Sequence, residues 1–128
     1  MKVLAITFLI LLGGTSCFRA QSINGVYADS SNGALKNCFA VFSQEGDTIR
    51  MTHYIEFNGL PFVEYGEGVV TGDSLIYRVK VTLNGPNWPT TGLHRLRIEE
   101  NGMALRGTYL DAKGNTGALV FTKETFDE

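Results

Sequence analysis

The clearest pattern in the chain is the segment TIRMTHYIEF, which runs from Thr48 to Phe57. Its odd-numbered positions are apolar except for His53, and its even-numbered positions are polar or charged apart from Tyr54. A β-strand sends successive side chains to opposite faces, so an alternation with period two is typical of a strand. The segment therefore predicts a strand with one face toward a core and the other toward water.

The same alternation continues along the chain beyond residue 20, and no segment there shows helical spacing. Pairs such as Asn58-Gly59 and Asn101-Gly102 accept positive φ, which is typical of tight hairpin turns between antiparallel strands. We treat residues 60–70 as one strand interrupted at Gly66 and Gly68, because isolated glycines inside a strand often mark a bulge or a sharp bend; splitting it there would give nine strands. The pattern predicts eight strands, near residues 23–28, 35–43, 48–57, 60–70, 74–83, 93–99, 103–110 and 116–123.

Neighbouring hairpin strands leave two edges unpaired unless the sheet closes on itself. With no helix to cover those edges, the predicted fold is all-β, an eight-stranded antiparallel up-and-down β-barrel. A β-sandwich is the alternative. The length of 128 residues allows one domain, and a content of 44% hydrophobic and 19% charged residues excludes a disordered chain.

The first twenty residues have the organisation of a secretory signal peptide. Lys2 is followed by an apolar run at 3–12 and by small residues at 13–16. We expect a signal peptide at 1–20, the barrel domain at 21–123 and an acidic tail at 124–128. The protein is thus expected to be exported, to the periplasm, the cell envelope or the extracellular space.

Ser16-Cys17 resembles the lipobox of bacterial lipoproteins, although Gly14 stands where that family usually has Leu. Under this alternative the signal ends at residue 16 and Cys17 carries a lipid, which is the only membrane contact we expect. Cleavage after Ala20 instead leaves Cys38 as the single thiol. Burial as a small hydrophobe is the default for Cys38, and a bridge between Cys17 and Cys38 is open only if Cys17 is retained.

The candidate site comprises polar side chains that alternation directs toward the interior: His53 and His94, with Tyr77 and Tyr109. Such groups among apolar neighbours suit a small, partly apolar ligand whose polar part they would hydrogen-bond. The plainer alternative is that both histidines are satisfied core residues. Two imidazoles could also ligate a metal or haem, but a metal needs a third ligand and only Glu64 is near, so we expect no cofactor.

A filled interior is the main alternative to a pocket, since a barrel of eight strands is only just wide enough for its own side chains. The residues expected to point inward are Met51, Phe57, Tyr77, Leu83, Leu96, Leu105, Tyr109 and Phe121. If they fill the lumen, function must lie on the outer surface or in the loops.

The loop at 84–92 contains Pro86, Pro89 and the only tryptophan, Trp88. Trp88 could contact a ligand, form a lid over the barrel mouth, or simply cap the core. The second functional hypothesis is therefore a surface-acting module that binds or inhibits a partner through the Trp88 loop.

Several function classes have little support. The chain lacks the recognisable motifs of hydrolases, zinc proteases and phosphate-binding loops, and His53 and Glu56 fall on opposite faces of one strand, so a binding protein is favoured over an enzyme. The formal net charge is -2 and becomes more negative without Lys2 and Arg19, which argues against nucleic-acid binding.

Two short segments carry a family resemblance. Asn24-Gly25-Val26-Tyr27 on the first strand and Leu105-Arg106-Gly107-Thr108-Tyr109 near the end look like elements of the small calycin barrels, the lipocalin-like and avidin-like proteins. Tyr27 stands where those families typically have Trp, and no ligand-binding residue of theirs can be carried over. The resemblance implies a barrel that holds a small ligand.

Overall fold

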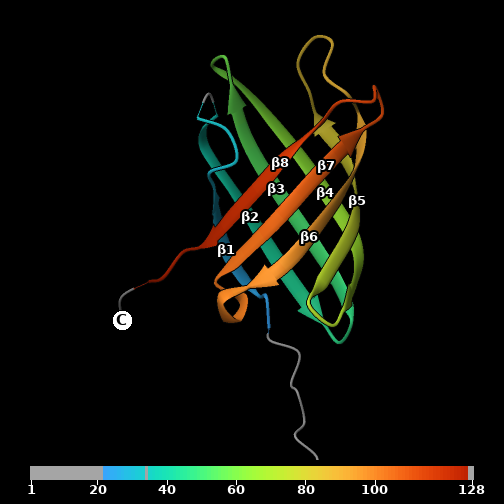
Figure 1. Ribbon diagram of the computed structural model, residues 1–128. Helices are drawn as coiled ribbons and strands as arrows, with labels where there is room; N and C mark the ends of the chain where they lie inside the picture. Colours follow the sequence, from blue (N-terminus) through green and yellow to red (C-terminus); the bar gives the residue numbers. More distant parts are fainter. Residues whose placement is uncertain (1–21, 34, 127–128) are drawn as a thin grey trace, which may run out of the picture.

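The computed structural model describes residues 22–33 and 35–126. Its strands are β1 (Gly25–Asp29), β2 (Lys36–Glu45), β3 (Thr48–Phe57), β4 (Leu60–Thr71), β5 (Ser74–Leu83), β6 (Thr91–Glu99), β7 (Ala104–Asp111) and β8 (Thr116–Lys123), with one short 3-10 helix, η1 (Glu100–Gly102). Each strand pairs antiparallel with the next, and β1 pairs with β8 to close the sheet (Figure 1). The predicted up-and-down barrel is confirmed, and the alternative β-sandwich is not formed.

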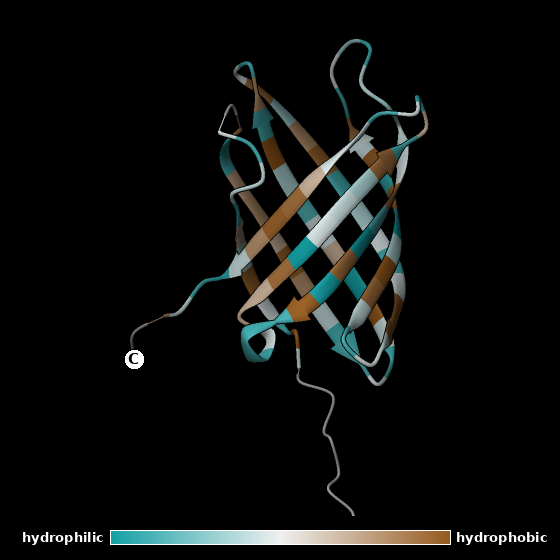
Figure 2. Ribbon diagram, in the orientation of Figure 1, coloured by the Kyte–Doolittle hydropathy of each residue, from teal (hydrophilic) through white to brown (hydrophobic). Residues whose placement is uncertain are grey.

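The strands begin and end within a few residues of the predicted positions. Hydrophilic and hydrophobic residues alternate along them, as Figure 2 shows. Within residues 22–33 and 35–126, no helix has the length and apolar character needed to cross a membrane. The predicted signal peptide, Cys17 and the end of the acidic tail lie outside the described residues.

β4 is a single strand, as expected, but the predicted bulge at Gly66 and Gly68 is wrong. β4 runs through both glycines, and the irregularity instead lies between Val63 and Glu64, where the paired strand β5 carries Thr82 as an additional residue. This extra residue breaks the alternation of β5. Leu83, expected to point inward, is consequently 48% exposed.

Gly68 and Gly107 permit close approach between neighbouring strands. A Cβ atom built on Gly107 would lie 1.8 Å from the carbonyl oxygen of Arg95, and one on Gly68 would lie 1.9 Å from that of Ile76. Real Cβ atoms do not come so close to backbone. Both positions therefore require glycine for the sheet to curve as it does.

One half of the barrel lumen is filled with side chains. We call this half the closed end; it lies toward η1 and the β2–β3 turn, at the bottom of Figure 1. Phe42 makes edge contacts there with Tyr27, Tyr77 and Phe121, with ring centroids 5.2 to 5.8 Å apart. The Tyr27 hydroxyl lies 3.0 Å from the carbonyl oxygens of both Ile23 and Gly102, and burial raises the pKa of Tyr27 to about 12.

Of the other side chains expected to point inward, Met51, Leu96 and Leu105 are buried, whereas Phe57 and Tyr109 are half-buried toward the opposite half, which we call the open end. The open end carries the long β5–β6 loop and the β7–β8 turn, at the top of Figure 1. The interior is thus neither wholly filled nor wholly hollow, because the large rings gather at one end of the lumen.

Candidate functional site

The open half of the lumen contains a cavity of about 850 Å³. Apolar side chains from several strands form part of its wall, including Ile55, Val79 and Leu119. His53, Glu64 and His94 are buried polar residues that also line it. The cavity therefore has a partly apolar wall and a compact, buried polar region formed by Asp29, His53, Glu64 and His94. Tyr77 does not line the cavity but bonds to His94 from beneath, and we call these five residues the polar floor.

Strand register explains why these side chains converge. His53 on β3 lies directly opposite Glu64 on β4, and His94 on β6 lies directly opposite Tyr77 on β5. Directly opposed residues of antiparallel strands project from the same face of the sheet. Each pair therefore enters the lumen at one level, although the residues are far apart in sequence.

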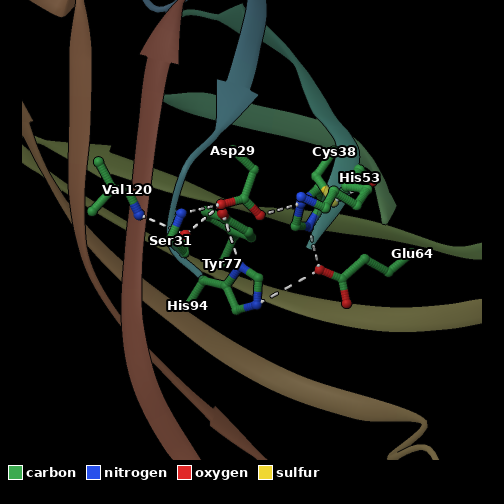
Figure 3. Close-up of polar contacts among 9 residues, drawn as sticks. Asp29, Ser31, Cys38, His53, Glu64, Tyr77, His94 and Val120 are labelled. Atoms are coloured by element: carbon green, nitrogen blue, oxygen red, sulfur yellow. Dashed lines mark hydrogen bonds and ion pairs between the residues drawn. The ribbon is translucent and has the colours of Figure 1, made fainter. Parts of the chain in front are cut away.

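The His53 ring is held between two carboxylates (Figure 3). Its Nε2 lies 2.9 Å from Asp29 Oδ2 and its Nδ1 lies 2.9 Å from Glu64 Oε1, with all three side chains almost fully buried. Both ring nitrogens can donate to ionised carboxylates only in the imidazolium form. Burial opposes that charge, but the two hydrogen bonds and the charges of Asp29 and Glu64 outweigh it and raise the pKa of His53 to about 9.

Asp29 is held in turn by the chain just beyond β1. Its Oδ1 accepts hydrogen bonds from the backbone N–H and the hydroxyl of Ser31, and Ser31 Oγ accepts one from the backbone N–H of Val120 on β8, 2.8 Å away. Burial alone would raise the pKa of Asp29. The hydrogen bonds from His53 and Ser31 lower it by more than burial raises it, so the net shift is downward. Asp29 is thus a fixed, ionised carboxylate.

His94 sits in the opposite protonation state. Its Nδ1 lies 2.9 Å from the Tyr77 hydroxyl, whereas its Nε2 is 3.7 Å from Glu64 Oε1, beyond hydrogen-bond distance. Burial raises the pKa of Tyr77 well above its ordinary value, so the phenol donates and Nδ1 accepts. Burial lowers the pKa of His94 to about 4; the Glu64 carboxylate opposes this shift and the charge on His53 adds to it.

The two histidines predict a maximum of stability near pH 6.5. In the folded protein His53 stays protonated up to about pH 9. Its contribution to the free energy of unfolding is therefore complete below the unfolded pKa of about 6.5 and is lost as the pH rises toward 9. His94 stays neutral in the fold down to about pH 4, so its contribution is lost as the pH falls from about 6.5 toward 4.

We expect the free energy of unfolding to fall by about 3 kcal/mol on each side, at about 1.4 kcal/mol per unit of pKa shift. Denaturant titrations at intervals from pH 4 to 9 measure it. Because the chain has only these two histidines, a His94→Gln variant should lose the acidic decline and keep the alkaline one. A profile flat across this range contradicts the assigned protonation states.

The structure brings three of the expected site residues together: His53, Tyr77 and His94 are all members of the polar floor. Tyr109 lies directly opposite His94 on β7 and lines the cavity, with its ring across Gly117, where a Cβ would lie 2.7 Å from Tyr109 Cε1. Trp88 also lines the cavity, away from the polar floor, and its ring is stacked on Phe62 with ring centroids 4.1 Å apart. The possible lipid site, Cys17, lies outside the described residues.

Cys38 packs in the same cluster as Trp88, with Ile55 and Phe62. Its thiol donates a hydrogen bond to the Lys36 carbonyl oxygen, 3.0 Å away, and burial raises its pKa. It is therefore a buried small hydrophobe, as expected.

Asp29 and Ser31 were not predicted as site residues, and Glu64 was considered only as a metal ligand. The available signal for Asp29 was its parity: it lies two residues after Tyr27, on the face of β1 that turns inward. An acidic residue at an inward position indicates a buried charge that needs a partner.

No group of three or more His, Cys, Asp or Glu side chains in the described part of the chain could hold a metal ion. The reason is visible at His53, where both ring nitrogens already face carboxylates. Glu64 acts as a hydrogen-bond acceptor for His53, so the arrangement is an ion-paired network.

Comparison of the chain with protein-family models, curated proteins and solved structures finds no match. The eight-stranded antiparallel barrel is compatible with the calycin resemblance at the level of topology.

Proposed function

We propose that the protein binds a small, partly apolar ligand inside the open half of the barrel. The observation that carries the proposal is the cavity of about 850 Å³, which combines apolar side chains in its wall with a polar floor. Ligand pockets typically measure about 300 to 1,000 Å³ and combine apolar walls with a few placed polar groups. The calycin resemblance supports the same role.

The polar floor supports this proposal because it is costly for stability alone. Replacing a buried ion pair with well-packed apolar side chains is often neutral or stabilising. Here the cavity is lined by His53 and by the two carboxylates with which it pairs. A barrel selected for stability alone would be expected to fill this space with apolar side chains. Orienting the polar part of a ligand is a reason for such a network to be there.

We place this binding outside the cytoplasm, in the periplasm, the cell envelope or the extracellular space. The support for this location is the signal-like segment at 1–20. The second hypothesis, a surface-acting module built on Trp88, has less support, because the tryptophan ring is stacked on Phe62 rather than presented to a partner.

A cavity-filling variant tests the proposal. Val81 lines the cavity and is half-buried, so Val81→Trp should occupy part of its volume; Val41→Trp adds the same ring to the outer wall, where Val41 is 50% exposed. The probe is Nile red, an uncharged fluorophore that brightens in apolar surroundings. We expect wild type and Val41→Trp to bind it alike, and Val81→Trp to bind at least about tenfold more weakly, a loss of about 1.4 kcal/mol.

Failure of wild type to bind Nile red, together with no small molecule in extracts of natively purified protein, would contradict the proposal. Equal binding by both tryptophan variants would place the probe outside the cavity and count against it as well. Far-UV circular dichroism confirms that each variant retains its strands.

A further inference from the structure

We infer that the ligand is an organic cation, an amine with an apolar body, whose ammonium group is bound by Glu64. This inference rests on the proposed function and names the chemical class that the cavity accepts. It is carried by the charges that line the cavity and by the free oxygen of a buried carboxylate.

The charges on the described residues that line the cavity are almost all negative. Three carboxylates, those of Asp29, Glu64 and Asp111, line it, and among residues 22–33 and 35–126 no lysine or arginine does. The one positive charge found on this part of the lining is the His53 imidazolium, which is shared between Asp29 and Glu64. The polar floor therefore carries one net negative charge, and Asp111 adds another nearer the mouth.

Glu64 has unused hydrogen-bonding capacity at this point. Its side chain is only 9% exposed, and Oε1 takes both the 2.9 Å contact with His53 and the 3.7 Å approach of His94. Among the described residues no hydrogen bond reaches Oε2, the oxygen drawn free of dashed lines in Figure 3. A carboxylate oxygen accepts and cannot donate, so its complement is a donor, and a charged donor forms the stronger bond.

The charges around Glu64 Oε2 determine which ligand head group, anionic, neutral or cationic, is favoured there. A carboxylate or phosphate head would enter a chamber that is already negative and whose one cation, His53, is bonded to two carboxylates, which is unfavourable. An uncharged hydroxyl could donate to Oε2 but gains little from the net charge. An ammonium gains both the hydrogen bond to Oε2 and the attraction of the net charge. His94 does not repel it, because that ring is neutral: its Nδ1 accepts from Tyr77, and its Nε2–H lies on the side of Glu64 Oε1, 3.7 Å away.

His53 acts in this arrangement as a positioning residue. Its bond to Oε1 holds the Glu64 carboxyl group in place, while Asp29 and Ser31 hold the His53 ring from the other side. The apolar wall at Ile55, Val79 and Leu119 then faces the body of the ligand. A bare metal ion would leave that wall without a partner, so the arrangement suits an organic cation.

A series of ligands with the same alkyl chain tests the inference. Octylamine, 1-octanol and octanoate differ at the head group, and at pH 7 they are cationic, neutral and anionic. Isothermal titration calorimetry on the full chain, below micelle-forming concentrations, is expected to give octylamine the tightest binding, at least about tenfold tighter than 1-octanol, with octanoate weakest. Equal binding of amine and alcohol, or tighter binding of octanoate, overturns the inference and leaves the proposed function standing.

Absence of binding by all three, with Nile red also failing to bind, overturns the proposed function as well, so the two failures are distinguishable. Glu64→Gln keeps the size of the side chain and removes its charge; we expect it to abolish the preference for the amine while alcohol binding persists. Glu67→Gln is the matched control, because Glu67 lies on the same strand, points outward and pairs with Arg50. A preference that survives in Glu64→Gln, or disappears in Glu67→Gln, contradicts the assignment to Glu64.

Discussion

Replacing His53 with leucine is expected to lower the free energy of unfolding at pH 7 by about 3 to 5 kcal/mol, the cost of breaking a buried ion pair by removing one partner. Leucine fills similar space but leaves Asp29 and Glu64 as buried carboxylates without the cation between them. The two negative charges would also repel each other. Denaturant titration followed by far-UV circular dichroism measures the loss.

Two further variants separate this explanation from a simple packing defect. Thr52→Leu changes the adjacent, exposed position of β3 and should leave stability within about 0.5 kcal/mol of wild type. Adding Asp29→Asn and Glu64→Gln to His53→Leu removes the unpaired charges and should recover much of the loss. If the triple variant is no more stable than His53→Leu, the charges are not the cause.

Replacing Gly107 with alanine is expected to destabilise the barrel by about 3 kcal/mol or more, at the upper end of what an overpacked methyl group costs. The new Cβ would lie 1.8 Å from the Arg95 carbonyl oxygen, which belongs to the neighbouring strand backbone and cannot rotate away. β6 and β7 would have to separate, weakening their pairing. Thermal and denaturant unfolding of the variant measure the effect.

The control for Gly107→Ala is Gly33→Ala. Gly33 lies in the exposed loop before β2, and a Cβ there meets no atom within 4 Å. Its replacement should change stability by no more than about 0.5 kcal/mol. Equal effects at the two positions would show that loss of glycine flexibility, and not the close strand approach, governs the outcome.

Alternation along single strands predicted the fold and three of the five residues of the polar floor. His53, Tyr77 and His94 were identified because each places a polar group on the otherwise apolar, inward face of its strand. Alternation does not predict side-chain direction where a strand is irregular: Leu83 turns outward because Thr82 is an additional residue in β5. No local pattern marks that residue, since its cause is the pairing with β4.

Parity also cannot tell at which level of the lumen an inward side chain lies. Asp29 meets His53 across β2, a neighbour set by the register of three strands and by the closure of β1 onto β8. The same registers gather Phe42 and Phe121 at the closed end. Whether the interior is filled or hollow therefore depends on long-range pairing, which single-strand patterns do not contain.

The packed rings at the closed end leave the described part of the barrel with one mouth, at the open end. The proposed ligand would then enter and leave by the same route, past the loop that carries Trp88. A competitor could not displace it from the other side of the barrel. Exchange between two ligands would be limited by dissociation of the first, so its rate should be independent of the concentration of the second.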